Sequence, residues 1–104
     1  MDEPRWLTAE LFAGREGQPF EVGEPGGPTL TVELVAVRQS SEPGGRSPDG
    51  QQRRQFSLDF RGPREPVLPQ STYAFAHDEL GPLLLFLVPQ GQDEDGTTYE
   101  AAFA

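Results

Sequence analysis

The sequence contains no cysteine and no lysine, and His77 is its single histidine. Without cysteine the chain can form neither a disulfide framework nor a thiolate site, and a structural metal centre would need clustered histidines instead. Without lysine a phosphate-binding loop of the Gly-x-x-x-x-Gly-Lys type is excluded. No run approaches the ~20 apolar residues of a membrane-spanning helix. These absences narrow the available chemistry, and we expect no cofactor and no metal.

The charged residues are strongly unbalanced. Seventeen acids stand against eight bases, all of them arginine, for a net charge of −9. Such a surface repels phosphate backbones and anionic lipid, so we expect no nucleic-acid and no membrane partner. The N-terminus is acidic and lacks the apolar segment of a signal peptide. We therefore expect a cytoplasmic protein by default, with incorporation into an extracellular assembly as an alternative.

Length and turn residues indicate a single β-rich domain over residues 1–104. Domains cluster near ~100–150 residues. Gly (12) and Pro (11) together make about 22% of the chain, just below the ~25–30% typical of disorder. They lie between apolar runs, as in a turn-rich β domain.

Alternation of apolar and polar side chains predicts six strands. They fall at residues 18–22, 29–38, 56–61, 73–77, 83–88 and 98–103. The alternation slips over 35–37, which indicates a β-bulge or a segment buried on both faces. Residues 83–88 are apolar on both faces, which favours a central strand, and Pro89 is expected to end it.

The remaining segments predict a short helix and a long loop. Thr8 is the expected N-cap of a helix over Ala9–Ala13, with Leu7 and Phe12 forming a hydrophobic staple. Residues 39–54 contain no large apolar side chain and are expected to form a flexible loop. Because most connections have hairpin length, the predicted fold is all-β and mostly antiparallel. It is a small six-stranded barrel or sandwich with one short N-terminal helix.

Several short patterns resemble an uncharacterised bacterial family of small β domains, the domain of unknown function 6916. They are Phe56-x-Leu-x-Phe-Arg-Gly-Pro, Leu68-Pro-Gln-x-Thr-Tyr73, His77-x-x-Leu-Gly81, Leu85-Phe-Leu-Val-Pro89 and the closing Gly91-x-Asp93-x-Asp95-Gly96. The resemblance covers nearly the whole chain apart from residues 39–54. It implies a small β fold and no catalytic residues. It further implies a place beside a phage-tail-like or surface-fibre assembly.

Two sets of residues are candidates for a hydrolytic triad and for a Ca²⁺ site. A hydrolytic triad would recruit His77 with Ser71 or Ser57 and with Asp59 or Asp78, but the sequence has no Gly-x-Ser-x-Gly nucleophile elbow. A histidine next to an aspartate at a strand end is more typical of a hydrogen-bonded turn. Asp93, Glu94 and Asp95 could bind Ca²⁺, yet they do not follow the EF-hand pattern and fit a solvated hairpin tip.

Four arginines and one tryptophan are candidates for protein contact. Arg53 and Arg54, with Arg61 and Arg64 further on, could form a basic patch that binds carboxylates, the alternative being four separate solvated charges. Trp6, near the N-terminus, is either a core plug or an interface anchor.

These patterns favour a non-enzymatic structural or protein-interaction module whose partner is another protein or a second copy. An open sheet edge would be the expected pairing site. Two alternatives stay open. One is a small-ligand-binding β-barrel with residues 39–54 as a lid, and the other is a hydrolase that uses His77.

Overall fold

The computed structural model describes residues 7–23, 29–46, 50 and 52–103. Trp6 therefore lies outside the described residues. The elements, in chain order, are α1 (Ala9–Phe12), β1 (Pro19–Gly23), β2 (Thr29–Arg46), β3 (Gln52–Gly62), β4 (Ser71–His77), β5 (Gly81–Asp93) and β6 (Gly96–Phe103).

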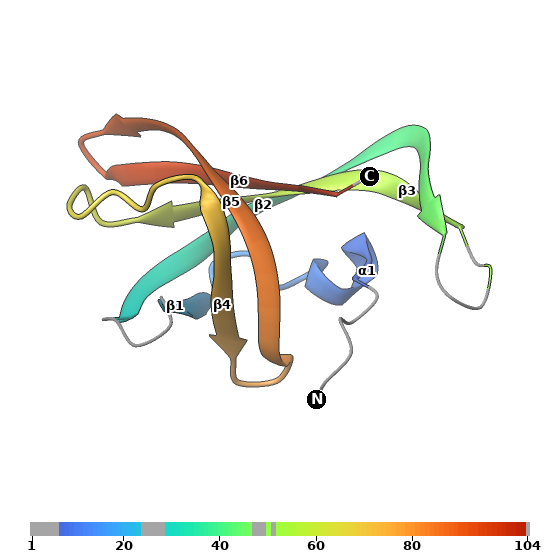
Figure 1. Cartoon of the computed structure of the whole chain (residues 1–104), viewed down its shortest axis with the longest axis horizontal. Helices are drawn as coiled ribbons and strands as arrows, with labels where there is room; N and C mark the ends of the chain where they lie inside the picture. The colour runs from blue at the N-terminus through green and yellow to red at the C-terminus, as the bar shows by residue number, and fades with distance from the viewer. Residues whose placement is uncertain (1–6, 24–28, 47–49, 51, 104) are drawn as a thin grey trace.

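The six strands form one antiparallel sheet that closes on itself. The order around the barrel is β1-β2-β3-β6-β5-β4, and β4 pairs back to β1. In Figure 1, β2, β3 and β6 cross the upper part of the molecule and β4 and β5 run down from it. The predicted all-β fold with one short helix is confirmed. Its form is the closed barrel, in which every strand pairs with two others. Within β5, Gly81–Leu87 pairs with β4 alone among the described strands.

Large side chains fill the interior of the barrel. Phe20, Phe60, Phe75 and Tyr99 are all less than 2% exposed. The ring centroids of Phe20 and Phe60 are 5.4 Å apart, and those of Phe60 and Phe75 are 5.2 Å apart. The period-2 alternation of each strand sends these side chains inward. The inside of the barrel is therefore a packed core.

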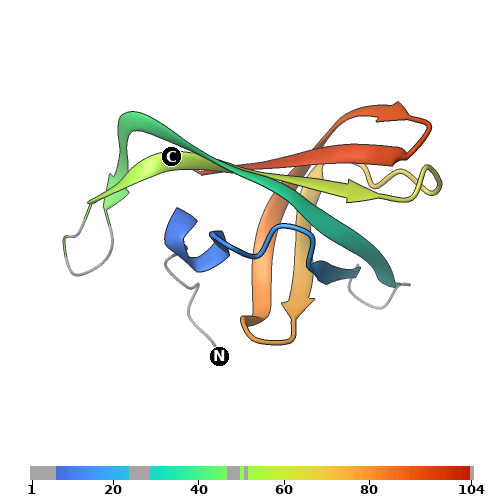
Figure 2. The same ribbon diagram turned by 180° about the vertical axis from the view of Figure 1, so that it is seen from behind.

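The helix α1 covers one end of this core. Phe12 is fully buried, and its ring centroid lies 6.4 Å from that of Phe20 and 6.5 Å from that of Phe56. Figure 2 shows α1 beneath the crossing of β2 and β3. Thr8 is the N-cap residue, as predicted, although its side chain makes no capping hydrogen bond, and the helix ends at Phe12.

The prediction of a flexible loop over residues 39–54 was wrong, because strands occupy most of this segment. β2 continues to Arg46 and β3 begins at Gln52, with Pro43 opposite Arg54 and Arg46 opposite Gln52. These parts of β2 and β3 form a two-stranded extension whose side chains are exposed or half-buried. It needs no large apolar residue, and this explains why composition alone indicated a loop. The predicted bulge is confirmed as a register shift between Leu34 and Ala36.

The expectation that Pro89 ends its strand was also wrong. β5 runs on to Asp93, and its pairing with β6 shifts register between Pro89 and Gly91. Proline cannot donate to a sheet ladder, and such an irregularity accommodates it. Within the described part of the chain, no helix has the length and apolar character needed to cross a membrane.

Candidate docking surface

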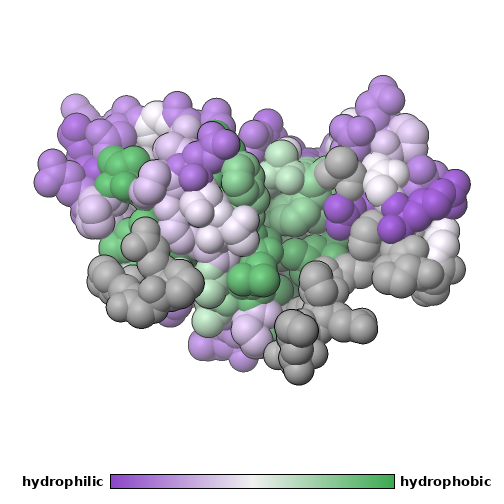
Figure 3. Space-filling view, in the orientation of Figure 1, coloured by the Kyte–Doolittle hydropathy of each residue, from purple (hydrophilic) through white to green (hydrophobic). Residues whose placement is uncertain are grey.

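The outer side of the β4–β5 ribbon is apolar along its length. Cross-strand pairing places Thr72 opposite Phe86, Ala74 opposite Leu84, and Ala76 opposite Pro82. We call the following set the apolar face: Thr72, Ala74, Ala76, Pro82, Leu84, Phe86 and Val88. In Figure 3, hydrophobic surface gathers over the middle of the molecule, where β5 runs in Figure 1.

Two large side chains dominate this face. Leu84 is 65% exposed and Phe86 is 47% exposed, whereas Leu83, Leu85 and Leu87 between and beside them point inward and are buried. β5 lies between β4 and β6, as a central strand would, but the outward half of the apolar run 83–88 is exposed. A strand of a closed barrel has a single side toward the core, and nothing in the described chain covers the other.

Acidic side chains lie at both ends of the apolar face. Glu21 on β1 lies opposite Ala76, and Glu100 on β6 lies opposite Val88. Asp78 and Glu79 occupy the turn between β4 and β5. The end of the ribbon near Pro82 thus carries three carboxylates, and the end near Val88 carries the carboxylate of Glu100.

The arginines near this rim are already paired. Arg38 donates to both Asp59 oxygens and to Glu100, at 2.6–2.9 Å. Hydrogen bonds to Asp59 and then to Glu100 raise the pKa of Arg38 above its ordinary value. Arg15 contacts Glu79 at 3.3 Å. The four rim carboxylates and Asp59, the other partner of Arg38, stand against two arginines, so the net charge at the rim is negative.

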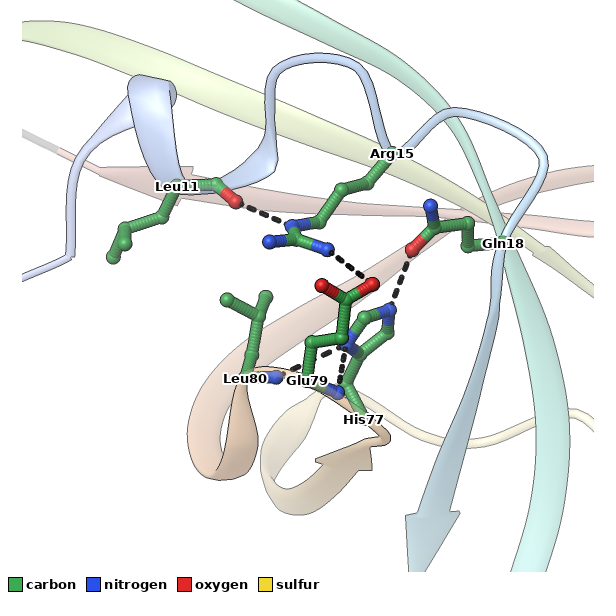
Figure 4. Close-up of polar contacts among 6 residues, drawn as sticks. All are labelled: Leu11, Arg15, Gln18, His77, Glu79 and Leu80. Carbon is green, nitrogen blue, oxygen red and sulfur yellow. Dashed lines mark hydrogen bonds and ion pairs between the residues drawn. The ribbon is translucent and has the colours of Figure 1, made fainter.

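His77 anchors the lower end of the ribbon (Figure 4). Its Nδ1 accepts hydrogen bonds from the backbone N–H groups of Glu79 and Leu80, both at 3.1 Å. Its Nε2 lies 2.6 Å from Oε1 of Gln18, which fits a neutral ring carrying its proton on Nε2. Together with the Arg15–Glu79 ion pair, these bonds fix the β4–β5 turn to the segment that follows α1.

Of the residues weighed with His77 for a hydrolytic triad, Asp78 is its neighbour in the turn, but the bonds of the ring nitrogens go to Glu79, Leu80 and Gln18. Ser71 is six residues away on β4, about 20 Å along the strand. Asp59 is bonded to Arg38, and Ser57 lies opposite Ala102 on β6. Both ring nitrogens of His77 serve the turn and Gln18, so its environment is that of a hydrogen-bonded turn.

The four candidate arginines occupy two separate places. Arg53 and Arg61 are eight residues apart on β3, about 26 Å, with Arg54 next to the first and Arg64 beyond the second. The Arg53 guanidinium lies 5.5 Å from the ring centroids of Phe56 and Phe103, and burial lowers the pKa of Arg53. Arg61 lies 4.0 Å from Asp93. The structure does not bring the four together as one basic patch.

The acidic turn and the surface hollows are the remaining features. Asp93 accepts a hydrogen bond from the backbone of Asp95 at 2.8 Å, and the described residues contain no cluster of three potential metal ligands. One hollow of about 500 Å³ lies between Thr8 and Arg54, and another of about 490 Å³ lies beside Arg61 and Asp95. Both are on the outside of the packed core.

Fold and surface together define a small closed all-β domain with an apolar outer face. The chain belongs to the family described as a domain of unknown function (DUF6916), whose family model matches residues 7–103. No curated protein and no solved structure matches the chain.

The apolar face was missed by sequence reasoning, although its signal was present. The run from Leu83 to Val88 is apolar on both sides of the strand, and its outward residues form part of the apolar face. The small residues Ala74 and Ala76 on the neighbouring strand were the second part of that signal.

Proposed function

We propose that this domain is a non-enzymatic protein-interaction module that docks a partner protein on the apolar face. The observation that supports the proposal is the exposure of Leu84 and Phe86 next to Ala74 and Ala76, on a ribbon held by the His77 hydrogen bonds. Exposed apolar groups that adjoin one another and are rimmed by polar residues mark interaction sites more often than isolated ones.

The energetics suit a docking role. Covering the exposed part of a leucine or phenylalanine contributes roughly 1–2 kcal/mol. Ala74 and Ala76 are small and exposed, so a partner side chain can pack over them beside Leu84 and Phe86. Interfaces depend on a few such central contacts, with a polar rim that excludes water. An accessory place in a phage-tail-like or surface-fibre assembly is one setting for a module of this kind.

The test compares two tagged baits in the native host. Quantitative mass spectrometry of captured proteins is done with the wild-type domain and with the double variant Leu84→Glu/Phe86→Glu. The control is Val67→Glu, which places one carboxylate, against two in the double variant, on a side chain that is 45% exposed but lies in the loop before β4. Thermal unfolding followed by circular dichroism shows whether each bait is folded.

We expect at least one protein to be retained by wild type and by Val67→Glu and to be lost, by tenfold or more, with the double variant. Equal recovery of every partner by the double variant would place docking elsewhere. Recovery of no specific protein by wild type would contradict the proposal.

A further inference from the structure

The apolar face has a defined length and a charge at each end. Pro82, Leu84, Phe86 and Val88 alternate outward along β5, which spans about 20 Å at ~3.3 Å per residue. Glu21, Asp78 and Glu79 lie at the Pro82 end, and Arg15 pairs with Glu79. Glu100 lies beside Val88 and shares Arg38 with Asp59, so that group keeps a net negative charge. The uncharged strip is therefore bounded by carboxylates at both ends.

β5 also has an unpaired side along this strip. It pairs with β4 from Gly81 to Leu87 and with β6 only from Val88 to Asp93. In the described part of the chain, the stretch from Gly81 to Leu87 thus has a neighbouring strand on one side. An extended segment laid along β5 could pair with this backbone while its side chains meet Leu84 and Phe86.

The charge of the rim determines which kinds of molecule can bind the apolar face. A second copy would bring its own carboxylate rim against this one, with −9 on each chain, and like charges facing each other across an interface disfavour association. Nucleic acid and anionic lipid are repelled for the same reason. A segment with basic residues is attracted, because its charges complement the rim.

We infer that the partner presents an extended apolar segment flanked by basic residues, with the two basic positions about six to eight residues apart. That spacing matches the ~20 Å strip in extended conformation, whereas a helix would need about thirteen residues to span it. This inference rests on the proposed function, because it names the partner of the same face.

The experiment uses a phage-displayed library of random twelve-residue peptides as the probe. Selection is done on the wild-type domain, with removal of phage that bind Leu84→Glu/Phe86→Glu. Peptides that survive are synthesised and their affinity is measured at 50 mM and 300 mM NaCl. The charge variant Glu21→Gln/Asp78→Asn is measured beside Val67→Glu as the control.

We expect a consensus of alternating apolar residues with Arg or Lys on both sides. Affinity should fall at least threefold between the two salt concentrations and three- to tenfold in Glu21→Gln/Asp78→Asn, with no change in Val67→Glu. Glu21 accepts a hydrogen bond from Thr31, and glutamine keeps the accepting oxygen, so folding should persist.

Other outcomes separate the inference from the proposed function. An apolar consensus without basic positions, or with basic positions at helical spacing, overturns the inferred chemistry and leaves docking on the apolar face in place. Failure to enrich any peptide over the double variant contradicts both. A dimer by light scattering that Leu84→Glu dissociates would make a second copy the occupant and overturn the inference.

Discussion

Gly96 begins β6 directly after the acidic turn, and its backbone has φ of +142°. A Cβ atom at this position would overlap the carbonyl oxygen of Gly62 on the neighbouring strand. A side chain at this position would therefore cause two kinds of strain. The backbone conformation disfavours any residue with a Cβ, and the Cβ would also press against the backbone of β3, which has little room to move. Strain of ~1–3 kcal/mol and overpacking of ~1–3 kcal/mol combine here.

We predict that Gly96→Ala lowers the free energy of unfolding by about 2–5 kcal/mol, measured by urea denaturation. Two other glycines give matched controls. At Gly81, φ is +75° but nothing lies within 4 Å of an added Cβ, and Gly91 has open space without a positive φ. Gly81→Ala should therefore cost about 1 kcal/mol, and Gly91→Ala should change stability by less than ~0.5 kcal/mol. Equal effects at Gly96 and Gly91 would contradict the clash.

The role of His77 could not be decided from the residues next to it in the sequence. Its position beside Asp78 was compatible with a triad or with a turn. The structure assigns its nitrogens to Glu79, Leu80 and Gln18, and its ring centroid lies 4.6 Å from that of Phe20.

We predict that His77→Phe, which keeps a ring against Phe20 but removes these hydrogen bonds, lowers the free energy of unfolding by about 1–3 kcal/mol. His77→Asn should lose less, because its side-chain oxygen can still accept from the turn. Chemical denaturation of the three proteins measures the order. Wild-type stability in His77→Phe would show that the bonds contribute nothing.

The elements differ in how well sequence alone predicts them. Strands with one polar side are predicted correctly from alternation, as in β3, where Phe56, Leu58 and Phe60 are buried and the residues between them are polar. The inner face of β5 is not, because its outward residues are as apolar as its inward ones. Alternation carries no information where both sides are apolar, and burial then depends on whether another layer covers the strand.

The extension of β2 and β3 was not predicted because it has too few apolar residues, whereas β5 has apolar residues on both sides. From Ser40 to Arg46 and from Gln52 to Gln55 neither side faces the core, so no apolar period exists to indicate a strand. Register shifts at Pro43 and Arg46 accommodate the proline and glycines that indicated a loop. Pairing with the other strand decides the structure here, and a single-sequence pattern does not contain it.

The candidate site follows the same rule. The arginines were grouped by their nearness in sequence, whereas a strand of eleven residues sets its two ends far apart. The apolar face depends on the β4–β5 hairpin, whose outer side has no covering layer in the described part of the chain.

At the scale of the whole molecule, the charge of −9 opposes the compact state, because folding brings the carboxylates closer together. Among the described residues four ion pairs are seen, and those of Arg38 and Arg15 are exposed enough that each contributes little. Salt screens both effects over a Debye length of about 10 Å at 0.1 M. We therefore expect the repulsion among the carboxylates to exceed the stabilisation that these ion pairs provide.

We predict that raising NaCl from 20 mM to 300 mM stabilises the domain, with a rise in Tm of roughly 2–6 °C for a gain of about 0.5–1 kcal/mol. Differential scanning calorimetry at constant pH measures it. Glu94→Gln/Asp95→Asn, which neutralises two exposed acids at the hairpin tip, should raise Tm at low salt and reduce the response to NaCl. Removal of Arg38 by Arg38→Gln should increase that response, since it makes the net charge more negative. A Tm that falls with NaCl would mean that the ion pairs outweigh the repulsion, and it would also weaken the charge argument for a basic partner.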